Sequence, residues 1–318
     1  MAKKRQTQYS GIGGQAVLEG VMMKNKTKYA VAVRKPDGDI DVQVEEYQGV
    51  CGDKKFAKLP LIRGVFAFID SLVLGMRVTM HSASFYEEEE EEAAKEETKK
   101  PSEGKADDIM MGVTVAVSVV IAVALFMFLP FLISDLLGKY IRNASLVAIL
   151  EGTLRILIFV GYIASISLMK DIRRLYMYHG AEHKCINCIE RGRPLTVKNV
   201  MRSSRQHKRC GTSFLLFVVL VSVIVFFFIR VDNMVLKLVL RLLLVPVIAG
   251  ISYEIIRIAG KSNNILIRII SAPGMWMQRL TTKEPDEDMV TVAIASVEAV
   301  FDWKAYLTDT FGYEADDL

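Results

Sequence analysis

The chain has 318 residues, of which 52% are apolar and 24% are charged, and its formal net charge is +4. The apolar share exceeds the roughly 45–50% of soluble domains, so the composition predicts membrane-spanning segments and excludes a disordered or collagen-like chain. The first residues are basic and polar and lack the apolar core of a secretory signal, so we expect the N-terminus to stay in the cytoplasm. Four cysteines are too few for a disulfide scaffold.

Residues 1–58 are expected to form a small cytoplasmic β unit. Its strands are predicted over residues 15–23, 29–35 and 39–47, and Pro36-Asp37-Gly38 supplies a turn between the second and the third. In the third strand, Ile40, Val42 and Val44 alternate with polar residues, as in a half-buried strand. The apolar face of this unit needs another element to cover it.

Residues 59–86 are predicted to form an amphipathic helix that is interfacial or re-entrant. Arg63, Asp70 and Arg77 recur every seven residues and therefore share one stripe of the helix. The stripe is either a solvated face or a functional polar seam. The acidic segment that follows, residues 87–108, repels itself and is expected to be a disordered tether.

Four apolar runs predict four transmembrane helices, at residues 109–133, 145–169, 212–229 and 235–253. They form two pairs within residues 109–169 and 212–256. The connection at residues 170–211 contains eleven Lys or Arg and three acidic residues, so it should be cytoplasmic, and both termini should then be cytoplasmic too. The predicted fold class is a mainly α, multi-pass protein of the cell membrane that carries a small β-containing cytoplasmic unit.

Charged residues occur inside two of these runs. In the predicted topology, Glu151 and Arg241 both lie about 10 Å below the outer surface, so they could pair between helices. Arg155, four residues after Glu151, is the local alternative partner. These intramembrane charges also motivate a transporter as the third functional hypothesis.

The C-terminal part, residues 257–318, is predicted to contain two helices outside the bilayer. Residues 265–280 combine apolar residues with arginines and Trp276, which is typical of a helix at the level of the lipid headgroups. Asp286 can cap a second, amphipathic helix, which should dock on the cytoplasmic domain.

The strongest chemical signal is the sequence His179-Gly180-Ala181-Glu182-His183. On a helix, two histidines four residues apart share one face and can hold one Zn²⁺, while the neighbouring Glu182 can act as the catalytic general base. Glu254, at the inner end of the last predicted span, is the expected third ligand.

A second metal pattern follows in the same connection. Cys185 and Cys188 form one closely spaced pair, and His207 and Cys210 form another. Two ligands from each of two turns would make a structural Cys₃His zinc site. The alternatives are free thiols in a basic loop or a redox role.

The basic charge of the connection at residues 170–211 follows from its topology, and aromatic residues that could stack on bases are few there. No specific nucleic-acid binding is therefore expected.

Four longer blocks carry a family resemblance. The sequence resembles the YqhQ-like family of bacterial membrane proteins at residues 13–23 (GGQAVLEGVMM), 178–184 (YHGAEHK), 207–212 (HKRCGT) and 273–278 (PGMWMQ). The resemblance implies a protein described only as a candidate metal-dependent enzyme, with no established substrate. It also adds Gln15 and Glu19 to the candidate site residues.

These observations lead to three hypotheses. The first is an integral membrane, zinc-binding protein that acts as a metal-dependent hydrolase at the cytoplasmic membrane face. The second is a non-catalytic, zinc-stabilised accessory factor for membrane-protein insertion or quality control, which would dock a translocon or a protease. The third is the transporter. The lipid bilayer is a partner in all three.

Overall fold

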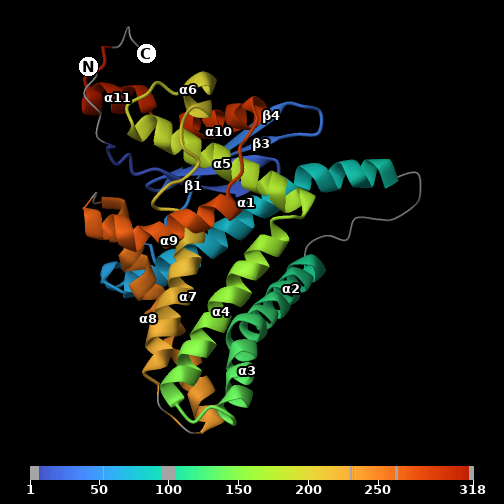
Figure 1. Ribbon diagram of the computed structural model, residues 1–318. Coiled ribbons are helices and arrows are strands. Elements are labelled where there is room, and N and C mark those ends of the chain that lie inside the picture. Colours follow the sequence, from blue (N-terminus) through green and yellow to red (C-terminus); the bar gives the residue numbers. More distant parts are fainter. Residues whose placement is uncertain are drawn as a thin grey trace.

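A computed structural model describes residues 7–52, 54–94, 105–229, 231, 233–261 and 264–314. The described chain is mainly helical and contains one small antiparallel sheet. In Figure 1 the sheet and the helices α5, α10 and α11 form one end of the molecule, and a bundle of apolar helices forms the other end. Helices α1 and α9 cross between these two parts.

The sheet has four strands in the order β1-β2-β3-β4: β1 (Gly13–Val17), β2 (Gly20–Asn25), β3 (Lys28–Arg34) and β4 (Ile40–Glu46). The first predicted strand is in fact a hairpin, because a turn at Leu18 and Glu19 divides it and Glu19 has a positive φ of 49°. The predicted turn before β4 is present, and Gly38 in it has a φ of 94°.

Both faces of the sheet are covered, each by different helices. Val21, Met23 and Ala32 pack against α5 (Lys170–Glu190) and α10 (Glu287–Val300) on one face. Leu74 and Val78 of α1 (Ile62–Ala94) cover the other. The prediction that β4 buries an apolar face was wrong: Val42 is 40% exposed and Val44 is 49% exposed. β4 is an edge strand, and the covering helices lie mainly over β1, β2 and β3.

Helix α1 is longer than predicted, and it contacts both the β unit and helix α8 of the bundle. It continues to Ala94, so the beginning of the predicted acidic tether is helical, whereas residues 95–104 lie outside the described residues. Its polar stripe bonds to the β unit, because Asp70 accepts hydrogen bonds from the Tyr47 hydroxyl (3.0 Å) and the Val50 amide (2.7 Å). The stripe is therefore structural along this part of the helix, and α1 connects the sheet to the bundle.

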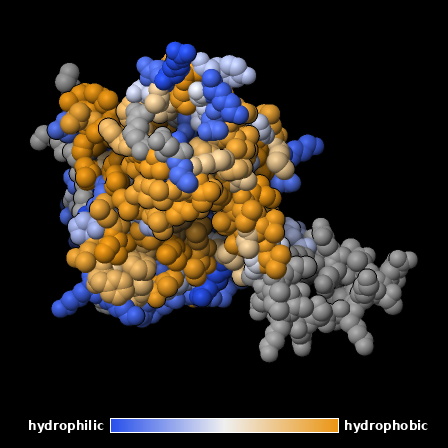
Figure 2. Space-filling model, turned by 90° about the horizontal axis from the view of Figure 1, so that it is seen from below, coloured by the Kyte–Doolittle hydropathy of each residue, from blue (hydrophilic) through white to orange (hydrophobic). Residues whose placement is uncertain are grey.

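The bundle consists of α2 (Lys105–Val123), the π-helical turn η2 (Ala124–Phe128), α3 (Leu129–Gly138), α4 (Ala144–Ile166), α7 (Gly211–Phe227) and α8 (Met234–Lys261). Three segments are long and apolar enough to cross a membrane: Gly112–Gly138, Ala144–Ile166 and Met234–Gly260. Helix α7 is apolar but has only 17 residues. Figure 2, which looks at the bundle from below, shows a largely apolar surface, as lipid contact requires.

The remaining helices hold the two parts together. Helix α9 (Ile265–Thr281) packs on α7. Asp286 caps the start of α10, since its carboxylate accepts a hydrogen bond from the Met289 amide at 2.8 Å. The capped helix docks on the sheet as predicted. The short elements η1 (Lys55–Lys58), α6 (Val197–Met201) and α11 (Trp303–Phe311) complete the fold.

Candidate metal centre

Helix α5 supplies the first three residues of the centre. It runs without a break through residues 179–183, so His179, Glu182 and His183 share one face. Gly180 permits this helix to pass directly under the segment before α10, since a Cβ atom there would lie 2.0 Å from the carbonyl oxygen of Lys283. The glycine is therefore required for close packing and does not interrupt the helix.

The same helix fastens the loop between α6 and α7, residues 202–210. Lys184 Nζ donates hydrogen bonds to the carbonyls of Met201 (2.7 Å) and Ser203 (3.1 Å). Asn187 Nδ2 donates to those of Ser204 (2.7 Å) and Gln206 (3.0 Å). These bonds give partners to carbonyls at the end of α6 and along the loop. The loop therefore lies along α5 and delivers Cys210 next to the histidines.

Gln278 of α9 holds the end of this loop from the other side. Its side chain is fully buried, accepts a hydrogen bond from the His207 amide (2.8 Å), and donates to the His207 carbonyl (2.7 Å) and to Ser213 Oγ (2.8 Å). Apart from the resemblance block at residues 273–278, no local pattern predicted this role for Gln278. A buried amide that bonds three groups fixes where α7 begins, and hence where Cys210 lies.

Three donor atoms converge at the centre. His179, His183 and Cys210 each offer one ligand atom, and these atoms lie within 4.8 Å of one another. His179 Nδ1 lies 2.9 Å from the Thr281 carbonyl, and His183 Nδ1 lies 2.7 Å from the Arg205 carbonyl. Because a carbonyl only accepts, both Nδ1 atoms carry a proton, so Nε2 is the atom of each ring that would bind a cation.

The charges of the centre are strongly coupled. Burial alone would lower the pKa of His179, but the neighbouring Cys210 sulfur outweighs it and raises this pKa to about 9. Conversely, burial would raise the pKa of Cys210, whereas the two histidines hold it well below its usual value. Cys210 therefore favours the thiolate form, which is the form that binds metals and acts as a nucleophile.

Glu182 lies beside these three residues. Its Oε2 atom is 3.9 Å from His179 Nε2, and the Gly14 amide of β1 donates a hydrogen bond to the carboxylate. Burial is the largest influence and raises the pKa of Glu182, although the two histidines oppose it. A carboxylate that gains a proton easily is suited to act as a general base.

The centre opens into a cleft of about 570 Å³. One wall is the glycine-rich start of β1, including Gly13 and Gly14. Another wall is apolar and comes from α1, α7 and α8: Phe68, Leu72, Phe214, Leu215 and Ile256. The cleft thus lies where the sheet meets the helix bundle, with the metal-ligand candidates on one side and apolar side chains of the bundle on the other.

Glu254 does not join the histidines, contrary to the prediction that it is the third ligand. It forms an ion pair with Arg63 of α1, in which Arg63 Nε donates to Glu254 Oε1 at 2.6 Å, and it also lies 3.5 Å from Arg257 Nη1. Both arginines thus interact with the Glu254 carboxylate oxygens that a metal ion would need. Among the described residues, Cys210 takes the third position of the histidine cluster instead.

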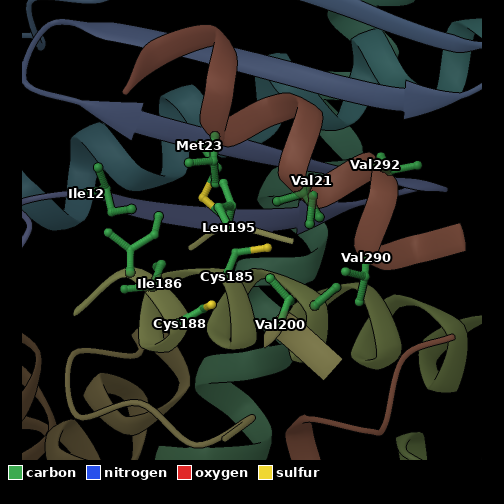
Figure 3. Packing of buried hydrophobic residues seen from close by; sticks show 14 of the residues in the cluster. Ile12, Val21, Met23, Cys185, Ile186, Cys188, Leu195, Val200, Val290 and Val292 are labelled. Carbon is green, nitrogen blue, oxygen red and sulfur yellow. The ribbon is translucent and has the colours of Figure 1, made fainter. Parts of the chain in front are cut away.

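The structure also separates the predicted Cys₃His set. Figure 3 shows Cys185 and Cys188 in the core with Val21 and Met23 of β2. The prediction assumed a knuckle, but α5 continues through both cysteines to Glu190, and the helix face that carries them is buried against the apolar core. Burial raises the pKa of both thiols, so they behave as small core residues.

His207 belongs to a neighbouring polar pair. Its Nε2 atom lies 3.4 Å from Glu190 Oε2, and its ring centre is 5.7 Å from that of His183. Glu190 also contacts Arg209 and accepts hydrogen bonds from the Ser10 amide (3.0 Å) and hydroxyl (2.8 Å). In this conformation His207 supports the wall of the cleft rather than the donor cluster.

The remaining predicted residues lie in three places. Gln15 lines the cleft. Glu19 lies outside it, in the β1–β2 turn, where it pairs with Arg174 and accepts a hydrogen bond from Tyr178 (3.1 Å). Glu151 and Arg241 lie within the bundle, where the structure contains both predicted pairs: Arg241 Nη1 is 2.6 Å, and Arg155 Nη2 is 2.8 Å, from Glu151 Oε1.

Comparison with known proteins gives a family and no activity. The family model described as "Protein of unknown function (DUF1385)" matches residues 59–303. The "Uncharacterized protein YqhQ" of Bacillus subtilis (strain 168) is 36% identical over 290 residues, which are 89% of this chain and 90% of that protein. No solved structure matches. Neither description names a metal or a reaction, so the enzymatic part of the resemblance finds no support in them. The chain belongs to the DUF1385 family and is related to the YqhQ protein of Bacillus subtilis.

Proposed function

We propose that this protein is an integral membrane, metal-dependent hydrolase whose centre is His179, His183 and Cys210. The observation that carries the proposal is the convergence of three donor atoms within 4.8 Å beside a buried carboxylate, at the end of a 570 Å³ cleft. Two imidazoles and one thiolate suit Zn²⁺, and three protein ligands leave one coordination position open, as in catalytic zinc sites.

Each residue of the centre would have a separate role in the hydrolysis. His179, His183 and Cys210 would hold the cation, which would supply Lewis acidity to the bound substrate. Glu182 would take a proton from the attacking water, and the Gly14 amide would orient its carboxylate. The carbonyls of Thr281 and Arg205 would keep both histidines in the tautomer that binds through Nε2.

The proposal includes a membrane arrangement. Helix α7, about 25 Å long at 1.5 Å per residue, would be the fourth span beside the three longer ones. The basic composition of residues 170–211 would place the sheet, the cleft and both termini on the cytoplasmic side. The apolar walls of the cleft would then receive substrates at the membrane surface.

The test uses the full-length protein in detergent or nanodiscs. Elemental analysis should find one divalent ion per chain in the wild type and less than a tenth of that in His183→Gln. Glu182→Gln should retain the metal but lose about 10²–10⁴-fold in hydrolysis of quenched-fluorescence peptides or chromogenic esters, the usual contribution of a general base. A wild type without metal contradicts the proposal, and a fully active Glu182→Gln contradicts the assigned role of Glu182.

One observation favours a second candidate. Cys210 precedes the N-terminus of α7, and its Sγ lies 3.3 Å from His179 Nε2, which is also the arrangement of a cysteine nucleophile and its base. A metal-free protein that is rapidly alkylated at Cys210 by iodoacetamide, and inactivated by it, would support this cysteine hydrolase. Protection of Cys210 by bound zinc would support the metal centre.

A further inference from the structure

A second cleft, of about 680 Å³, lies at the opposite end of the helix bundle. It is formed by α3, α4, α7, α8 and the connections α3–α4 and α7–α8. Its described lining carries four basic side chains, Lys139, Arg142, Lys237 and Arg241, and two acidic ones, Asp135 and Glu151. The described wall is thus positively charged on balance.

The buried acidic residue of the cleft, Glu151, already has hydrogen-bond partners on both carboxylate oxygens. Glu151 is shared between Arg155 and Arg241, and all three side chains are at least 91% buried. Its second oxygen also receives Arg241 Nη2 at 2.9 Å and the Ser134 hydroxyl at 3.2 Å. The Nε atoms of both arginines are buried without a hydrogen-bond partner among the described atoms. One carboxylate therefore compensates two guanidinium groups, which leaves an excess positive charge among apolar helices, where such a charge is unfavourable.

The basic residues form a series from the rim to the interior. Lys139 and Arg142 are exposed in and beside the α3–α4 connection. Lys237 lies about one turn into α8 and Arg241 about two turns, or roughly 10 Å, from its start at Met234. An anion that enters from the rim would meet cations at each level.

The surroundings of the rim indicate what kind of anion it is. Exposed apolar side chains flank the cleft on α3 and α8: Leu136 (57% exposed), Leu137, Val235 (70%), Leu236 and Val239. Tyr140, 86% exposed, lies between the basic residues of the α3–α4 connection, as aromatic residues do at the level of headgroups. A ligand with a phosphate head and apolar tails would contact both the cations and these side chains.

We propose that this cleft binds the phosphate group of an anionic phospholipid. The headgroup would neutralise the excess charge of the Glu151, Arg155 and Arg241 cluster and contact Lys139, Arg142 and Lys237 directly. The acyl chains would lie along the exposed apolar faces of α3 and α8. The site is independent of the metal centre and lies at the other end of the bundle.

The experiment is native mass spectrometry of the full-length protein, titrated with phosphatidylglycerol or with phosphatidylcholine of the same acyl chains. The rim variant Lys139→Gln/Arg142→Gln/Lys237→Gln changes side chains that are not fully buried and leaves the buried cluster intact. The matched control Lys170→Gln/Lys198→Gln/Lys304→Gln removes the same charge from exposed positions outside the cleft. Thermal unfolding verifies that both variants are folded.

The wild type and the control should retain one phosphatidylglycerol in preference to phosphatidylcholine, and the rim variant should bind it at least about tenfold more weakly. Equal affinity of the wild type for the two lipids would overturn the proposal, as would equal losses in the rim variant and the control. Millimolar inorganic phosphate should not displace the lipid. Displacement would assign the site to free phosphate and overturn the lipid assignment. If the rim variant does not fold, the single variant Arg142→Gln is compared with Lys170→Gln by the same criterion.

Discussion

The Nε2 atom of His179 lies 3.3 Å from the Sγ atom of Cys210, although 31 positions separate the two residues in the sequence. The contact joins a helix to a loop that this same helix fastens by its own side chains. Metal binding and the packing of the loop are therefore expected to depend on one another.

The cysteines of the chain should differ in their effect on metal content. Cys210→Ala removes one donor of the cluster, so bound metal should fall to less than a tenth of the wild-type value. Cys185→Ala removes only a buried sulfur atom from the core, which should lower stability by about 1 kcal/mol and leave the metal in place. Elemental analysis and thermal unfolding of both variants measure these effects. Equal metal loss in the two variants would contradict the assignment of Cys210 as a ligand.

Gly180 should not tolerate a side chain. In Gly180→Ala the new Cβ atom would overlap the Lys283 carbonyl oxygen, which belongs to the backbone and cannot rotate away, so we expect a loss of at least about 2 kcal/mol. Gly161→Ala in α4 is the matched control, because nothing lies within 4 Å of its Cβ position. That change should be neutral or stabilising. Thermal unfolding compares the two, and equally stable variants would show that α5 and the segment before α10 do not pack this closely.

Stability should fall in acid because of Glu190. Burial opposes its ionisation, but the hydrogen bond to His207 and the charge of Arg209 dominate and lower its pKa to about 2, below the unfolded value of about 4.3. The folded state then binds fewer protons than the unfolded state between these values. The stabilisation is therefore complete above about pH 5 and is lost as the pH falls towards 2. Burial also lowers the pKa of His207, so its protonation below about pH 6.5 acts in the same direction.

Glu190→Gln tests this dependence. The variant should be less stable at neutral pH by an amount on the order of 3 kcal/mol, and its unfolding temperature should change less between pH 5 and pH 3 than that of the wild type. Unfolding followed at several pH values provides the measurement. An unchanged acid slope in the variant would show that other groups control the acid sensitivity.

In the buried ion cluster, replacing the acidic residue should cost more stability than replacing one of the arginines. Glu151→Gln leaves two buried arginines without a counter-charge, for which we expect a loss of about 3–5 kcal/mol or a failure to accumulate in the membrane. Arg155→Met leaves a balanced pair of Glu151 and Arg241, so it should be tolerated better. Membrane yield and unfolding temperature rank the variants. The reverse order would mean that Glu151 is not the residue that balances both arginines.

The proposed topology predicts which residues are accessible from outside the cell. In a Cys51→Ser background, Tyr140→Cys is 86% exposed at the α3–α4 connection and should react with a membrane-impermeant maleimide on intact cells. Lys304→Cys in α11 should react only after the membrane is opened. Labelling of both sites on intact cells would rule out a cytoplasmic sheet.

Local patterns in the sequence determined much of this protein. The apolar runs at residues 109–133, 145–169 and 235–253 coincide with helices long enough to cross a membrane, because length and apolarity alone decide that property. The spacing of His179, Glu182 and His183 placed them on one helix face, since the helical period fixes which neighbours meet. Asp286 correctly predicted the start of α10 for the same local reason.

Only the tertiary structure decided which distant residues complete the site. Cys188 and Cys210 carry the same chemical group. Because α5 continues to Glu190, Cys188 is buried in the core, whereas the loop along α5 places Cys210 next to the histidines. Glu254 was an equally plausible ligand in sequence until its pairing with Arg63 of α1 was known. Such choices depend on how helices far apart in the chain pack and on which partner satisfies each buried charge, and no local period encodes either.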